Sequence, residues 1–119
     1  MLNFTFYQKQ GNPIIMDVLE DYYERLANSG LAKQVLYSDY KIKVEEEEYD
    51  ILAVKLDFDN RDRILKILEV ERQQELKKFF AQINNPTIKE IRENLDFVKF
   101  LTDMYERIKD EESLYFSYE

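Results

Sequence analysis

The chain has 119 residues and a formal net charge of −8, and it contains neither cysteine nor histidine. The lack of cysteine excludes disulfides and thiolate metal sites, and the lack of histidine excludes histidine acid–base catalysis, Ser-His-Asp triads and His-ligated zinc. The negative charge disfavours direct binding to nucleic acid or to an anionic membrane surface, because long-range repulsion must first be overcome.

Length and composition predict a single α+β domain over residues 1–119. With 45% hydrophobic and 14% aromatic residues, the chain can bury about two-thirds of its unfolded surface. A compact monomer of this length has a radius of gyration of about 13–14 Å. No apolar stretch approaches the roughly 18 residues of a membrane span, and the amino terminus does not resemble a signal peptide. We therefore expect a cytoplasmic protein.

The first third of the chain predicts a strand followed by a helix. Residues 2–7 alternate between apolar and polar, which is typical of a half-buried strand. Asn12 is a candidate N-cap with Pro13 at the first helical position, and apolar residues at near-helical spacing follow over 14–26. Gly30 ends this predicted helix. Residues 31–37 are too few for periodicity to separate a helix from the lead into a strand.

The middle of the chain predicts an antiparallel hairpin and then helix. Residues 40–44 and 50–57 have strand character and are separated by an acidic connection over 45–49. The second of these strands is apolar on both faces, which favours an internal place in a sheet. Residues 61–83 form either two helices or one long helix, because a polar segment separates two apolar clusters.

The last third predicts the clearest helix and an aromatic tail. Asn85 followed by Pro86, or Thr87 with Glu90, provides its start. The helix itself has a broad apolar face over 88–108. Residues 113–119 form either an edge strand or an exposed segment, so we expect 110–119 to be an exposed acidic and aromatic tail. The whole pattern predicts a small, mainly antiparallel sheet packed on one side by about three amphipathic helices.

Carboxylates at the predicted strand-to-helix junction are the best candidates for a metal site. Asp57, Asp59 and Asp62 lie together there, but the segment lacks the glycine and the final glutamate of a calcium-binding loop. We favour a structural role, in which Asp59 or Asn60 caps the following helix. We predict no cofactor, no metal and no catalytic residue, and we keep a carboxylate- and Mg²⁺-dependent enzyme as the weakest alternative.

Acidic and tyrosine-rich segments predict a surface that binds a partner. Glutamates occupy positions 45 to 48, a second acidic run covers 110–112, and nine tyrosines are many for a chain of this length. Tyrosine is favoured at interfaces because it combines a large apolar area with a polar group. The predicted partner-binding residues are Glu45, Glu46, Glu47, Glu48, Asp50, Tyr37, Tyr40, Tyr115, Phe116 and Tyr118.

These features favour a non-catalytic protein that binds another protein and regulates or inhibits it. A mobile-element or phage antagonist, a nucleic-acid mimic or an immunity-like protein would fit, and its partner would be a basic, nucleic-acid-handling enzyme. The alternative is a regulator that contacts nucleic acid through a basic helix face with Arg61, Arg63, Lys66, Lys77 and Lys78. A homodimer is considered as well, because the last helix has an apolar face wide enough to pack against a second subunit.

Overall fold

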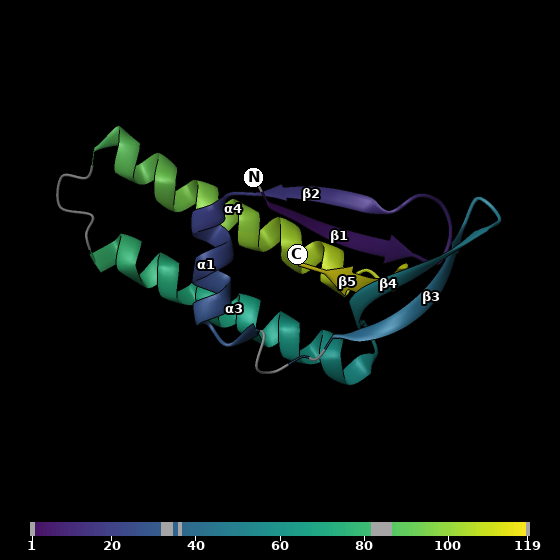
Figure 1. Cartoon of the computed structure of the whole chain (residues 1–119). Coiled ribbons are helices and arrows are strands. Elements are labelled where there is room, and N and C mark those ends of the chain that lie inside the picture. Colours follow the sequence, from purple (N-terminus) through teal and green to yellow (C-terminus); the bar gives the residue numbers. More distant parts are fainter. Residues whose placement is uncertain (1, 32–34, 36, 82–86, 119) are drawn as a thin grey trace.

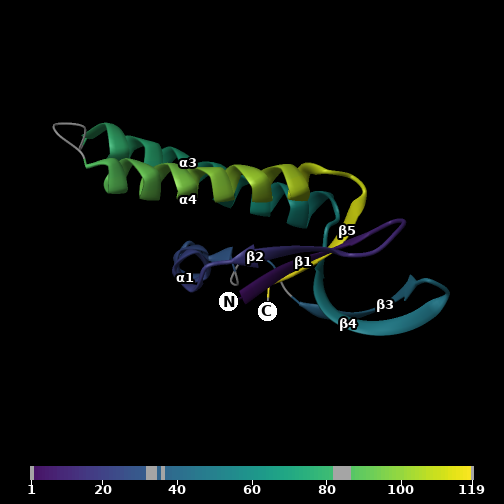
Figure 2. The same cartoon turned by 90° about the horizontal axis from the view of Figure 1, so that it is seen from above.

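Five strands, a short helix and a helical hairpin make up the fold in the computed structural model, which describes residues 2–31, 35, 37–81 and 87–118 (Figure 1). In chain order the elements are β1 (Leu2–Gln8), β2 (Ile14–Val18), α1 (Glu20–Asn28), β3 (Ser38–Val44), β4 (Glu47–Lys55), α3 (Phe58–Ala81), α4 (Ile88–Lys109) and β5 (Ser113–Ser117). All strand pairs are antiparallel, in the order β2-β1-β5-β4-β3. Figure 2 shows α3 and α4 over one face of this sheet. The predicted α+β class is confirmed.

The centre of the sheet is the hydrophobic core. Phe4 and Phe6 of β1 are fully buried, which confirms the predicted strand and its alternation. Phe116 of β5 pairs with Phe6 on one side and with Val54 on the other, and is also fully buried. The prediction of an edge strand or an exposed tail is therefore wrong for 113–118, and only 110–112 are exposed. Alternation identifies a strand, but long-range pairing decides its place in the sheet.

The predicted helix over 14–26 is wrong in its first part. Residues 14–18 form strand β2, paired with β1, and helix α1 begins only at Glu20. The apolar residues of this segment satisfy a two-residue alternation and a helical spacing equally well, and pairing with β1 buries Val18. The predicted stop is confirmed, because Gly30 follows the end of α1 with a φ of +95°.

The β3–β4 hairpin, called the arm below, is confirmed with a shorter connection than predicted. The connecting turn consists of Glu45 and Glu46 alone, and Glu47, Glu48 and Tyr49 already belong to β4. β4 lies between β5 and β3, so its predicted internal position is also confirmed. Figure 2 shows the arm curving away from the helices.

Residues 58–81 form one continuous helix, α3. Its cap is Asp57, whose Oδ1 accepts the backbone N–H of Asn60 at 2.8 Å, so the predicted cap at Asp59 or Asn60 moves back to Asp57. The polar middle of α3 packs against α1, where Glu75 is buried in an ion pair with Arg25. The Arg25 guanidinium also lies 3.6 Å from the centre of the Phe97 ring of α4. Arg25 thus joins all three helices.

The helical hairpin extends beyond the sheet. The Thr87 hydroxyl caps α4 by accepting the N–H of Glu90, as predicted, whereas 84–86 lie outside the described residues. Only the second half of α4 is buried, and Ile88 and Leu95 of its predicted apolar face are 77% and 50% exposed. The chain is therefore elongated, with extents of 56 × 24 × 21 Å and a radius of gyration of 15.8 Å.

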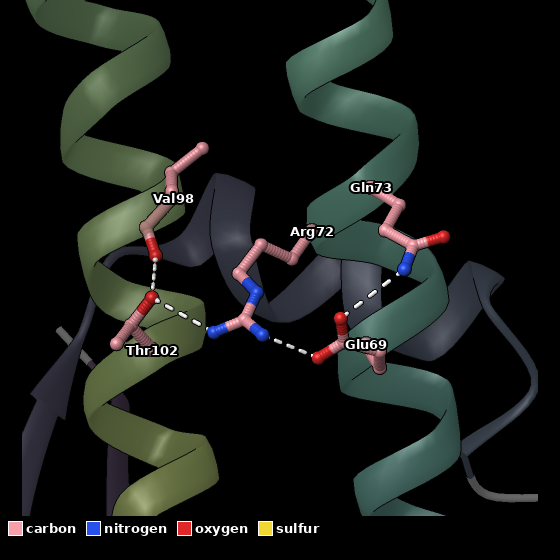
Figure 3. Close-up of polar contacts among 5 residues, drawn as sticks. All are labelled: Glu69, Arg72, Gln73, Val98 and Thr102. Atoms are coloured by element: carbon pink, nitrogen blue, oxygen red, sulfur yellow. Dashed lines mark hydrogen bonds and ion pairs between the residues drawn. The ribbon is translucent and has the colours of Figure 1, made fainter.

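Polar contacts tie α3 to α4 and to the strand ends. Figure 3 shows Arg72 of α3 between Glu69 and Thr102, where it donates to the Glu69 carboxylate and to the Thr102 hydroxyl. Arg61, near the start of α3, donates to backbone carbonyl oxygens at the ends of β4 and α4 and at the start of β5, namely those of Leu56, Ile108, Asp110 and Ser113. These bonds hold β5 and the arm in a defined position relative to the helices.

Candidate functional site: the open face of the sheet

One face of the sheet is not covered by any helix among the described residues (Figure 2). Side chains of directly paired residues share a face, and Tyr7 pairs with Tyr115, Tyr40 with Ile51, and Ile42 with Tyr49. The face opposite Phe6 and Phe116 thus carries a group of aromatic and branched aliphatic side chains, with the exposed Lys55 beside Tyr115. It is called the open face below and consists of Tyr7, Tyr40, Ile42, Tyr49, Ile51 and Tyr115.

The open face is hollowed where the arm curves past the β1–β2 turn. A cavity of about 330 Å³ is lined there by Tyr7, Pro13, Ile42, Val44, Tyr49, Asp50 and Ile51. Beside it the Tyr40 and Tyr115 rings lie 4.7 Å apart, and both side chains remain partly exposed. A concave, mainly apolar surface with phenol hydroxyls at its margin is the usual form of a binding site.

The acidic tip of the arm, Glu45, Glu46 and Glu47, lies at one end of this surface. Glu47 is on the same face as Tyr49, and the Tyr49 hydroxyl donates to its carboxylate at 2.6 Å. This hydrogen bond raises the pKa of the Tyr49 phenol, because it favours the protonated form. Both turn residues have a left-handed backbone, with φ of 52° for Glu45 and 68° for Glu46.

The predicted acidic run is divided between the two faces of the arm. Glu48 and Asp50 are paired across the strands with Lys43 and Lys41, on the face opposite Tyr49. Opposite charges at directly paired positions compensate each other. In the β3–β4 register no basic residue stands opposite Glu45, Glu46 or Glu47, so negative charge is concentrated at the acidic tip, next to the open face.

The predicted tyrosines also separate into two groups. Tyr40 and Tyr115 belong to the open face, whereas Tyr37 and Tyr118 stack with ring centres 4.6 Å apart on the α1 side of the sheet. The Tyr37 hydroxyl accepts the backbone N–H of Tyr118 at 2.7 Å, so this pair closes the edge of the core. Phe116 is fully buried and is not available to a partner, so its prediction as a binding residue is wrong.

Several residues of the open face were not predicted, namely Tyr7, Ile42, Tyr49 and Ile51. Each is a strand residue with partial or full exposure. The alternation of the strands carries the signal, since it places these residues opposite the buried set. Reading that signal requires knowing which face the helices cover, which alternation alone does not specify.

Two of the three carboxylates proposed for a metal site, Asp57 and Asp62, have structural partners. Asp57 caps α3, and Asp62 pairs with Lys66 at 2.8 Å. Among the residues that the structure describes, no group of three acidic side chains is placed to hold a metal ion. The contacts of Asp57 and Asp62 give these two residues structural roles at the start of α3.

The basic residues of α3 do not form one patch. Arg61 is bound to backbone carbonyls, and Lys66 is paired with Asp62. Lys77 and Lys78 lie about three turns farther along the helix, roughly 16 Å from Lys66 at 1.5 Å per residue. The residues of the alternative nucleic-acid surface are therefore dispersed along α3.

In the described part of the chain, no helix has the length and apolar character needed to cross a membrane. Comparisons by sequence and by structure find no matching protein family, no matching curated protein and no matching solved structure. The function is therefore argued from the geometry and charge of the open face and its acidic tip.

Proposed function

We propose that this chain is a non-catalytic protein that binds another protein through the open face and the acidic tip, and thereby regulates or inhibits it. The observation that carries the proposal is an uncovered, concave sheet face in which partly exposed tyrosines adjoin the clustered carboxylates of the acidic tip. Apolar area supplies affinity, and the charged tip supplies orientation and a faster encounter.

The turn at the tip supports this proposal because its residues are a poor choice for stability. Two-residue hairpins with positive φ at both positions favour Asn-Gly, and Glu45 and Glu46 both have positive φ here. A side chain in this region costs about 1–2 kcal/mol per residue. Like charges at adjacent positions add repulsion. Two glutamates at these positions are therefore better explained by a function of the carboxylates than by folding.

The charge of the tip indicates the kind of partner. A negative surface next to an apolar hollow fits a basic protein, and the groove of a nucleic-acid-handling enzyme combines positive charge with exposed apolar or aromatic surface. Occupation of such a groove would block the enzyme's own substrate. This is the mode of action of an acidic antagonist, such as one encoded by a phage or mobile element, or of an immunity-like protein.

The test is affinity capture from a lysate of the native host at about 0.1 M and 0.5 M salt, since screening separates electrostatic from apolar recognition. Wild type is compared with a tip variant, E45Q/E46Q/E47Q, and with an open-face variant, Y40A/Y115A. The matched control, E20Q/E24Q/E93Q, removes the same number of exposed carboxylates from the helices.

We expect the tip variant to lose capture of a basic protein at low salt, and the open-face variant to lose it at both salt concentrations. The control should behave as wild type. For a captured enzyme that binds nucleic acid, duplex DNA added in excess should displace this chain. Equal capture by wild type and by both site variants would show that the open face is not the binding surface.

A further inference from the structure

The two edges of the sheet differ in how they are protected. β3 forms one edge, and its exposed residues Asp39, Lys41 and Lys43 are charged. Charged side chains, lysine above all, are the usual device against edge-to-edge pairing. β2 forms the other edge and reads Ile-Ile-Met-Asp-Val; its exposed residues are the apolar Ile15, which is 63% exposed, and one charged residue, Asp17. No described strand pairs with its outer side, so β2 is the edge that can accept another strand.

A groove runs between β2 and α4, beside this free edge. One hollow of about 730 Å³ is lined by Ile14, Ile15 and Met16 of β2 and by charged residues of α4, including Glu106, Arg107 and Lys109. A second hollow, of about 410 Å³, continues past Met16 and Asp103, which line both, to the half-exposed Leu19. The edge and the groove together form one continuous apolar strip with a charged wall.

We propose that the β2 edge pairs with β2 of a second copy of this chain, antiparallel and about a two-fold axis at Ile15. In this register Ile15 faces Ile15 of the second copy on one side of the sheet. Ile14 faces Met16 of the second copy on the other side, next to the groove. The most exposed apolar residue of the strand is thereby covered. Asp17 lies outside these apolar pairs, opposite Pro13 of the second copy.

The self-complementarity of the strip favours a second copy over an unrelated segment. A two-fold interface requires one patch to match itself. The apolar side chains of β2 do so in the register above. The wall at the end of α4 also fits, because the acidic Asp103 and Glu106 precede the basic Arg107 and Lys109 along the helix, with Asp110 after them. When two such walls run antiparallel, the acidic residues of one face the basic residues of the other. A wall with charges of a single sign would instead repel its copy.

Pairing at β2 also has a consequence for partner binding, and this consequence rests on the proposed function. The arm lies at the opposite edge of the sheet from β2. Two chains joined at β2 would therefore form one continuous sheet with an arm at each end. Such a dimer presents two copies of the open face and binds a dimeric or repetitive partner with increased avidity.

The test uses the untagged full chain and begins with its molar mass in solution, measured by light scattering and sedimentation from about 5 to 200 µM, where interfaces of modest affinity become populated. I15K places two lysines opposite each other at the axis and should raise the dimer dissociation constant at least about tenfold. Because the chain has no cysteine, I15C gives a direct test of the register, since paired Cα atoms lie within disulfide range.

Under mild oxidation I15C should form a covalent dimer in high yield. The matched control K43C, on the exposed β3 edge, should not. D17C should also fail, because its two copies would lie roughly 13 Å apart in this register. A monomeric wild type at the highest concentration, or I15C cross-linking no better than K43C, would overturn the proposal. Efficient cross-linking of D17C in place of I15C would overturn the register at Ile15. None of these readouts depends on partner binding, so the dimer and the proposed function fail separately.

Discussion

The covered part of the sheet and the arm are built from similar strands but hold their shape differently. Under α3 and α4 one face of each central strand is fully buried, as at Phe6 and Phe116. The arm extends past the helices, so Leu52 is 45% exposed although it lies on the same face of β4 as the fully buried Val54. Stability therefore constrains the residues of the covered part, whereas those of the arm are free to be selected for binding.

The largest test of this contrast compares two adjacent residues of β5. Phe116→Ala removes a fully buried ring, so we expect the free energy of unfolding to fall by about 3–5 kcal/mol. Tyr115→Ala removes a partly exposed ring from the open face and its contact with Tyr40, and should cost only about 0.5–1.5 kcal/mol. Urea unfolding measures both. Equal losses for the two variants would mean that the open face is part of the core.

The second test concerns the turn of the arm. Replacing Glu45 by Asn and Glu46 by Gly gives residues that tolerate positive φ, and should stabilise the arm by about 1–2 kcal/mol while weakening partner capture. Hydrogen exchange of the β3 and β4 amides, together with urea unfolding, measures the gain. The control E45Q/E46Q removes the same charges but keeps the unfavourable backbone. If E45Q/E46Q were as stable as the Asn-Gly variant, the whole gain in stability would come from the loss of charge repulsion and not from the backbone conformation.

The smallest expected effect is a pH dependence of the unfolding free energy that comes from a tyrosine in the covered part of the molecule. Burial raises the pKa of the Tyr22 phenol above its ordinary value of 10.0, and the Asp96 carboxylate acts in the same direction. The unfolded chain therefore releases this proton at lower pH than the folded chain. The unfolding free energy should fall as the pH rises above about 10, towards the folded-state pKa. The difference between wild type and Tyr22→Phe in this range isolates the effect, and parallel curves would contradict it.

The candidate site could be predicted only in part from the sequence. Glutamates 45 to 48 resist burial in any fold, and the predicted exposure of the acidic run is confirmed. The tyrosine-rich segments selected Tyr40 and Tyr115, which lie on the open face, yet the same criterion selected Phe116 from the core and the Tyr37–Tyr118 pair at the core edge. Composition has no information on which face a side chain occupies, and the face decides whether it is available to a partner.

Local physics was sufficient for the features that depend on near neighbours. The class of the fold, strand β1, the Thr87 cap and the end of α1 at Gly30 follow from alternation, capping chemistry and positive φ, each of which acts within a few residues. The exclusion of histidine and cysteine chemistry follows from composition alone.

Tertiary structure decided the features in which two local patterns compete or in which distant segments meet. Residues 14–18 satisfy a helical and an alternating pattern, and pairing with β1 selected the strand. β5 became a central strand because its Phe116 fills the space between Phe6 and Val54, contributed by segments that are far apart in the chain. The open face exists because α3 and α4 cover only the other side of the sheet. Burial of apolar area is non-local, so it overrides a local preference wherever the two differ.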